Sequence, residues 1–270
     1  KYDFFITADS GKTSVCNGVL ISLTDNGDGT QTYHWQMNDE IPTYLANVSV
    51  ANYVAVRDTF SGMNGQIPIA IYVLPGDSTK AVNSFVNIKE ILTGFENRYG
   101  PYKWDRVGFA ACPLGGGMEH ATNISYGDFL INGNLTYEWL YAHEISHHWF
   151  GDLVTCREAE EMWLNEGWAV YSEAITQENL YGKNAYKQYV RDNHTWVLRS
   201  SHIEDGGYRA LVGIPHEYTY GTIVYDKGGD VAHTIRGYMG DSLFFPAVKK
   251  YLDSLSFNDA VSTDMRDRKS

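Results

Sequence analysis

The chain has 270 residues, of which 43% are apolar and 14% aromatic, and its formal net charge at neutral pH is −12. This charge, with no basic stripe to neutralise phosphates, excludes a nucleic-acid-binding protein. No apolar run approaches the roughly 20 residues that a membrane-spanning helix needs. The chain begins with Lys1 rather than Met, and residues 1–20 lack the basic, apolar and small-residue order of a signal peptide. We therefore expect a processed or excised fragment.

Up to about residue 75 the sequence has the patterning of β-structure. Short runs of β-branched and aromatic residues alternate with turn residues, and residues 25–30 have the composition of a turn. We expect a fragment of an antiparallel sheet, followed by a domain boundary at the Pro-Gly-Asp-Ser of residues 75–78. The strands expected here are residues 15–23, 31–37, 47–56 and 67–74.

From residue 80 the pattern becomes mixed. Apolar residues recur at helical spacing over residues 81–99, and residues 104–111 resemble a strand. Strands followed by a set of packed helices predict an α+β fold. The further helices expected are residues 136–151, 157–181, 184–200, 223–239 and 244–253.

The helix expected over residues 136–151 carries the most informative motif in the chain. His143, Glu144 and His147 form an H-E-x-x-H sequence, and residues i and i+4 of a helix lie on the same face. The two imidazoles can therefore bind one metal ion, while Glu144 lies about 100° round the helix, beside the metal, as a general base. Glu166, nineteen residues after His147, is a candidate third ligand. A fourth position would stay open for water.

The alternative for this motif is a set of polar residues on the solvated face of a helix. Ile145, Trp149 and Phe150 lie beside them in the sequence, and such a polar cluster is unfavourable to bury without a metal or partners. The three cysteines have no C-x-x-C spacing, so a thiolate zinc site is not expected. The motif therefore predicts one Zn²⁺ per chain, bound by histidine and glutamate.

The residues around the motif resemble a known family. Residues 143–155, His-Glu-Ile-Ser-His-His-Trp-Phe-Gly-Asp-Leu-Val-Thr, are similar to the zinc signature of the aminopeptidase N and leukotriene A-four hydrolase family of zinc metallopeptidases, the gluzincins. Residues 116–120, Gly-Gly-Met-Glu-His, resemble that family's G-x-M-E-N motif, and residues 225–229, Tyr-Asp-Lys-Gly-Gly, its Y-x-K-G segment. The motifs occur in the family's order and at similar spacing.

The resemblance implies a thermolysin-like catalytic domain with zinc on His143, His147 and Glu166. Glu144 is then expected to take a proton from the zinc-activated water as that water attacks the peptide carbonyl, and to pass the proton to the leaving amine. By the same resemblance, Tyr225 is expected to donate a hydrogen bond to the tetrahedral oxyanion.

The Gly-Gly-Met-Glu segment implies recognition of an amino terminus. Glu119 would pair with the free ammonium group of the substrate, which accounts for an enzyme that trims chain ends. The backbone of Gly116, Gly117 and Met118 would lie along the substrate as an edge strand. The expected partners are therefore peptides with a free N-terminus.

Two positions leave alternatives open. His120 stands where the family has asparagine, and it is either a tolerated hydrogen-bonding substitution or a residue that alters the pH profile. Glu173 lies seven residues after Glu166, on the same helix face. It either accepts a hydrogen bond from the free ring nitrogen of a ligand histidine or is a solvated carboxylate.

The resemblance divides the chain into residues 1–77, the C-terminal part of a β-rich domain, and residues 78–270, the catalytic domain. It implies that the missing N- and C-terminal domains of the full-length protein pack on this chain. The expected function is a zinc aminopeptidase; the alternatives are an inactive fragment or scaffold relative, and an epoxide hydrolase and aminopeptidase of the leukotriene branch. Low lysine content and abundant Asn, Gly, Thr and Tyr favour a bacterial periplasmic or secreted enzyme, although the family also has cytosolic and membrane-anchored members.

Overall fold

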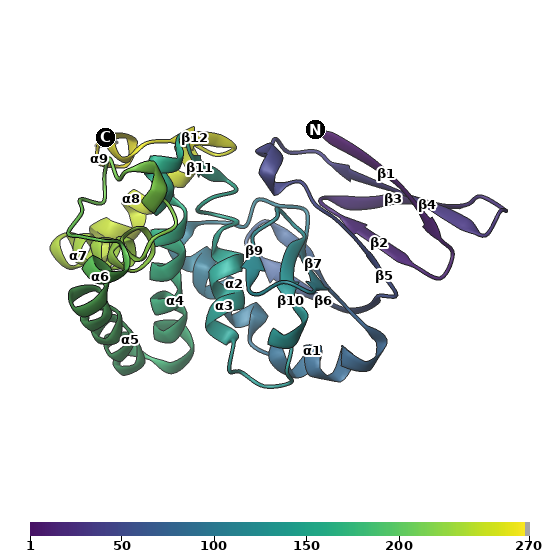
Figure 1. Cartoon of the computed structure of the whole chain (residues 1–270), viewed down its shortest axis with the longest axis horizontal. Helices are drawn as coiled ribbons and strands as arrows, with labels where there is room; N and C mark the ends of the chain where they lie inside the picture. The colour runs from purple at the N-terminus through teal and green to yellow at the C-terminus, as the bar shows by residue number, and fades with distance from the viewer. Residues whose placement is uncertain (268–270) are drawn as a thin grey trace. The chain divides into compact units, whose positions relative to one another are not determined.

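The computed structural model describes residues 1–267 and divides into two compact units. The first unit comprises residues 1–89 and 102–148, and the second comprises residues 90–101 and the chain from residue 149 onward. Figure 1 labels the helices and strands of both units. The first unit holds most of the strands and the second most of the helices, so the expected α+β class is confirmed. Within the described part of the chain, no helix is both long and apolar enough to cross a membrane.

The N-terminal strands form two small antiparallel sheets. In one sheet β4 lies between β1 and β3, and in the other β2 pairs with β5. Tyr33, Trp35 and Met37 of β4 are buried while the residues between them are half-buried, because successive side chains of a strand point to opposite faces. The buried face of β4 shares an apolar core with β2, β7 and β8. The elements are β1 (Tyr2–Asp9), β2 (Thr13–Cys16), β3 (Val19–Asp25), β4 (Thr30–Met37), β5 (Val48–Ala51) and the 3-10 helix Thr43–Leu45.

A five-stranded sheet in the order β6-β7-β8-β10-β9 forms the rest of the first unit. β7, β8 and β10 run parallel, whereas β6 and β9 pair antiparallel at the two edges. The central strands β8 and β10 are almost wholly buried, and α3 packs against β9 and β10 (Figure 1). The elements are β6 (Val54–Gly62), β7 (Gly65–Val73), β8 (Val107–Cys112), β9 (Gly117–Met118), β10 (Ile124–Gly127), α1 (Ser78–Ser84), α3 (Glu138–Ser146) and the 3-10 helices Pro75–Asp77 and Asp128–Leu130.

In the second unit, α5 and α7 pack on α4. The Trp168 ring of α4 stacks on Phe150 and on Phe244 of α8, with ring centroids 4.6 and 5.9 Å apart, and β11 pairs with β12. The elements are α2 (Ile88–Tyr99), α4 (Glu166–Tyr181), α5 (Lys183–Trp196), α6 (His202–Glu204), α7 (Gly228–Met239), α8 (Asp241–Ser254), α9 (Ser262–Asp267), β11 (Val154–Cys156), β12 (Asn258–Ala260), the 3-10 helices Ala159–Leu164 and His216–Tyr218, and the π-helical turns Val197–Ser201 and Ile223–Lys227.

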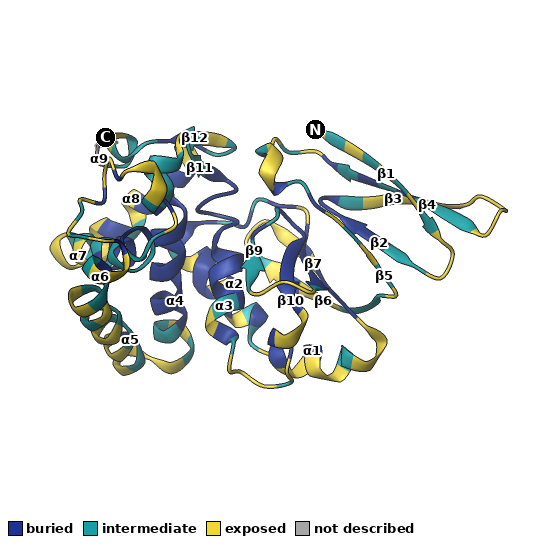
Figure 2. Cartoon of the chain, viewed as in Figure 1, coloured by how far each residue is buried: buried dark blue, intermediate teal, exposed yellow. Residues whose placement is uncertain are grey.

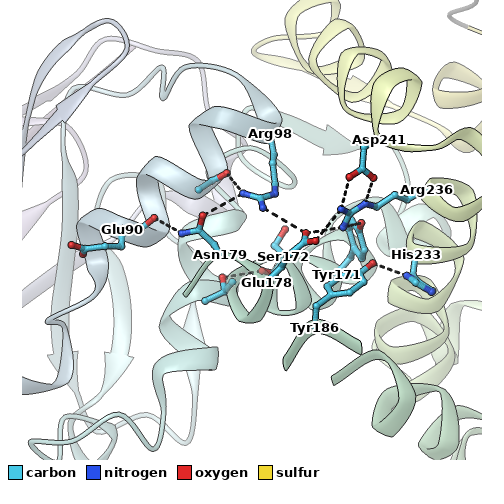
Figure 3. Close-up of polar contacts among 12 residues, drawn as sticks. Glu90, Arg98, Tyr171, Ser172, Glu178, Asn179, Tyr186, His233, Arg236 and Asp241 are labelled. Carbon is cyan, nitrogen blue, oxygen red and sulfur yellow. Dashed lines mark hydrogen bonds and ion pairs between the residues drawn. The ribbon is translucent and has the colours of Figure 1, made fainter. Parts of the chain in front are cut away.

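A charged network joins four of these helices (Figure 3). Arg236 of α7 donates two hydrogen bonds to Glu178 of α4, at 2.9 and 3.2 Å, and two to Asp241 of α8, at 2.6 and 2.9 Å. Arg98 of α2 lies 3.5 Å from the same Glu178 carboxylate. Paired bonds between a guanidinium and a carboxylate fix orientation as well as distance. The network therefore holds α2, α7 and α8 in place around α4.

Several helices differ in length from the prediction. The helix expected over residues 81–99 is interrupted between α1 and α2. The helix expected over residues 136–151 ends at Ser146, and the following turn reaches Gly151, whose φ of 131° is rarely adopted by other residues. The helix expected over residues 157–181 begins only at Glu166, after a 3-10 helix. Strand β1 was not among the predicted strands.

Candidate active site

The helix α3 presents three of the predicted site residues. The rings of His143 and His147 lie one helical turn apart, with centroids separated by 4.9 Å. His147 directly follows the last residue of α3, but its φ and ψ remain helical and its N–H still donates to the carbonyl of His143. Both imidazoles and the Glu144 carboxylate are buried, and α3 is mostly dark in Figure 2. The pair of histidines on one helix face is thus present as predicted.

Strand β9 places a second carboxylate beside this helix. A Cβ atom at Gly117 would lie only 2.3 Å from the Glu144 carboxylate, so only glycine lets the strand backbone come this close to the expected base. Glu119, two residues further on, is buried. One donor atom from each of Glu119, Glu144 and His147 lies within 4.8 Å of the others. The first unit therefore brings together the expected base, a predicted zinc ligand and the carboxylate predicted to bind the substrate amine.

The second unit holds Glu166 at the start of α4 and Tyr225 in the middle of the π-helical turn Ile223–Lys227. Two glycines let these elements touch, because a Cβ atom at either Gly167 or Gly228 would lie 2.8 Å from the other's Cα. A larger residue at either position would push the turn that carries Tyr225 away from α4. This contact was not predicted, although glycine directly follows Glu166 and stands at the end of the Tyr-Asp-Lys-Gly segment.

His143 and His147 in the first unit and Glu166 in the second are buried side chains of the types that bind zinc. Two imidazoles and one carboxylate are a donor set of catalytic zinc sites, and three protein ligands leave a coordination position for water or substrate. The residues present therefore fit the zinc ion that the sequence predicts.

His120 is neutral at pH 7. Its Nδ1 lies 2.9 Å from the amide nitrogen of Asn47 and 3.0 Å from the Ser125 hydroxyl. The amide nitrogen can only donate, so Nδ1 accepts and the ring proton is on Nε2. Burial lowers the pKa of His120 to about 4. The hydrogen bonds and the lowered pKa support the first alternative, in which His120 is a tolerated hydrogen-bonding substitution for asparagine. They do not favour a group that alters the pH profile near neutrality.

Glu173 is not solvated. It is 5% exposed, and it accepts a hydrogen bond of 2.6 Å from the hydroxyl of Tyr189. The reading of Glu173 as a surface carboxylate is therefore wrong. Its hydrogen bond to a ligand histidine stays a prediction.

Asp226, the neighbour of Tyr225, is an unusually weak acid. Burial raises the pKa of its carboxyl to about 6, and the nearby carboxylates of Glu173, Asp230 and Asp205 act in the same direction. The Trp196 indole N–H donates a hydrogen bond of 3.2 Å to Asp226, which partly opposes the rise in pKa. The ionised carboxylate therefore destabilises the folded state.

Asp226→Asn is expected to raise Tm by a few degrees at about pH 8 and to have little effect near pH 4. A carboxyl whose pKa is raised by folding destabilises the protein where it is ionised. This penalty disappears as the pH falls through 6 toward the ordinary value for aspartate. Thermal unfolding across this range measures the effect, with Asp192→Asn, an exposed carboxylate of α5, as the control for net charge. A difference in Tm that is independent of pH would contradict the prediction.

A helix that carries an H-E-x-x-H motif and packs on a mixed sheet is an arrangement typical of zinc metallopeptidases. The model of the peptidase family M1 domain matches residues 84–269. The chain therefore belongs to peptidase family M1, and the resemblance that its three motifs indicated is confirmed.

The relatives of the chain are aminopeptidases by name. Probable aminopeptidase 1 of Sulfurisphaera tokodaii is 22% identical over 96% of this chain and 34% of its own length. Aminopeptidase B of Homo sapiens is 27% identical over 99% of this chain and 41% of its own length. The M1 zinc metallopeptidase of Deinococcus radiodurans has the same fold, with a TM-score of 0.85 at 19% identity over 97% of this chain and 58% of that chain. This chain thus spans about a third of the first of these relatives.

Proposed function

We propose that the protein is a zinc-dependent aminopeptidase that hydrolyses the N-terminal peptide bond of peptides. The observation that carries the proposal is the buried group of Glu119, Glu144 and His147 in the first unit. A carboxylate this close to the base and to a metal ligand is explained by pairing with the ammonium group of the residue whose bond is cut. The names of the relatives, aminopeptidase 1 and aminopeptidase B, support the same activity.

Each residue then has one task in the reaction. Zinc, when bound, would polarise the scissile carbonyl and make a water molecule more acidic. Glu144 accepts the proton of the attacking water and donates it to the leaving amine. The hydroxyl of Tyr225 donates a hydrogen bond to the oxyanion. His143, His147 and Glu166 would hold the metal.

The edge strand β9 supports binding of an extended peptide. It is the last strand of its sheet, and a strand at a sheet edge offers backbone groups to which a peptide can add. Glu119 comes directly after Met118, the last residue of β9. A peptide on this edge would therefore meet a carboxylate, and only a free amino terminus can pair with it there. A mutant of the Deinococcus radiodurans enzyme has been solved with the substrate Tyr-Ser-Ala, which supports a peptide as the substrate class.

Glu119→Ala is expected to lower kcat/KM for peptides with a free amino terminus by roughly ten- to hundred-fold, because one charge-assisted hydrogen bond to the ammonium is lost. Zinc content should stay at that of the wild type. The measurement is the hydrolysis of aminoacyl fluorophores, with Glu119→Gln as the matched variant that keeps shape and loses charge. Unchanged kinetics in both variants would remove Glu119 from the substrate site.

The first test of the activity itself is metal content, measured together with release of an aminoacyl fluorophore before and after chelation. We expect one zinc per chain, and release that is lost with the metal and restored by zinc. The N-acetylated substrate should be inert. Cleavage of the acetylated substrate at an equal rate would contradict an aminopeptidase.

We also propose that other domains of a longer protein pack on this chain, and that residues 1–77 belong to a β-rich domain that precedes the catalytic domain of residues 78–270. The exposed side chains of Ile203 (67%) and Tyr208 (88%) in the second unit support the first part, since such apolar surface marks interfaces. Hydrogen exchange that is no slower around these residues in a longer protein than in this chain would contradict it.

A further inference from the structure

Thr122, three residues after Glu119, has an unfavourable backbone conformation. Its φ is 61°, in the left-handed region, where a β-branched residue is a clear outlier. Its side chain is completely buried. Such strain persists only where the surroundings impose it, and strained residues concentrate at functional sites.

Three contacts impose this conformation. The backbone N–H of Thr122 donates to Nε2 of His148 at 3.3 Å. The Thr122 hydroxyl accepts a hydrogen bond of 2.7 Å from the N–H of Gly18. The carbonyl of Thr122 lies where a side chain at Gly108 would be, 2.3 Å from a Cβ atom there. Of these three groups, the imidazole alone comes from residues 143–155, the segment that resembles the zinc signature.

The hydrogen bonds of His148 define which of its nitrogens carries the proton. The Tyr102 hydroxyl donates to the carbonyl of Arg106 at 2.8 Å, and it also lies 2.9 Å from Nδ1 of His148. A hydroxyl has one proton to donate, so it must accept from Nδ1–H. Nε2 is then the acceptor that the N–H of Thr122 requires. His148 is 1% exposed, and its carbonyl accepts a hydrogen bond of 2.8 Å from the indole of Trp104.

His148 thus links two parts of the candidate site. It directly follows the zinc ligand His147, while Thr122 ends a tight turn after Glu119. Within this turn the N–H of His120 donates to the carbonyl of Met118, and the N–H of Asn123 donates to the carbonyl of His120. A change in the backbone at Thr122 would therefore shift the carboxylate at its other end.

We propose that His148 is a positioning residue. By accepting the N–H of Thr122 it holds the strained turn and so fixes Glu119 relative to the helix that carries the zinc ligands. This inference rests on the proposed function, in which Glu119 binds the amino group of the substrate. His148 itself touches neither substrate nor metal in this role.

The test compares His148→Met with His148→Gln. The two side chains are similar in length, but only glutamine keeps an acceptor for the N–H of Thr122. With an aminoacyl fluorophore, His148→Met should raise KM roughly ten-fold and change kcat less, because binding of the ammonium is weakened. His148→Gln should stay within about two-fold of the wild type. Zinc content should be unchanged in both, and amide exchange at Thr122 should be faster only in the methionine variant.

The outcomes distinguish a failure of the role of His148 from a failure of the proposed aminopeptidase function. Equal effects of both substitutions, or no effect of either, would overturn the role of the acceptor nitrogen. A wild-type protein without chelator-sensitive aminopeptidase activity would refute the proposed function, whereas amide exchange would still test the contact between His148 and Thr122. If His148→Met does not fold, Tyr102→Phe replaces it. This change removes the acceptor for Nδ1–H, so it should raise KM and speed exchange at Thr122, and wild-type values would overturn the proposal.

Discussion

Replacing Glu144 by glutamine is expected to leave zinc in place and to lower kcat by about 10³-fold. The substitution keeps the shape of the side chain, which lies against the backbone of Gly117, but an amide cannot accept the proton of the attacking water. The measurement is steady-state hydrolysis of an aminoacyl fluorophore, together with the zinc content of the same preparation.

Glu144→Asp serves as the comparison. The shorter side chain keeps a carboxylate base but moves it away from the backbone of β9. We expect an activity between those of wild type and Glu144→Gln. Loss of zinc from the glutamine variant would mean that Glu144 is a ligand, which would overturn its assignment as the base. Turnover of Glu144→Gln near the wild-type rate would also overturn the assignment of Glu144 as the base.

Tyr225→Phe is expected to lower kcat by about 10²–10³-fold, as does the loss of a single oxyanion donor in other hydrolases. KM and zinc content should change little, because the hydroxyl is needed in the transition state rather than in the bound substrate. The contact between Gly167 and Gly228, which keeps the turn of Tyr225 against α4, does not involve the hydroxyl. This backbone contact should therefore be retained in the variant, and Tm measures whether the fold is retained with it.

The chain contains a matched control for this substitution. Tyr238 of α7 is 90% exposed, so Tyr238→Phe makes the same chemical change away from the candidate site. We expect wild-type kinetics for this control. A Tyr225→Phe variant that is as active as Tyr238→Phe would remove Tyr225 from the reaction.

The parts of the candidate site that depend on local periodicity were predicted from the sequence. His143 and His147 share a helix face because of their spacing alone, and the resemblance of three short segments indicated the family. The strands β4 and β7 were also predicted, since their alternating or continuous apolar residues are local signals. The β1 strand was missed; its half-buried residues alternate with exposed ones that include Phe5.

What could not be predicted depends on residues that are far apart in the chain. His148 lies 26 positions from Thr122, and nothing in the sequence next to a predicted zinc ligand indicates that its imidazole accepts a hydrogen bond from the backbone of Thr122. Helical propensity alone would also have extended α3 beyond Ser146 and begun α4 before Glu166. The roles of the glycines at 167 and 228 appear only when the two backbones are seen in contact.

The buried polar groups around His120 also restrict covalent modification. Asn47 and Asn123 each begin an Asn-x-Ser triplet, the acceptor sequence for N-linked sugars. Their amide nitrogens, where a sugar would be attached, donate hydrogen bonds to Ser125 and to Asn47 respectively. A bulky glycan at either nitrogen has no room in this fold, so a glycosylated triplet and a folded molecule exclude each other. The exposed Asn134 is an acceptor that can carry such a sugar without disturbing the core.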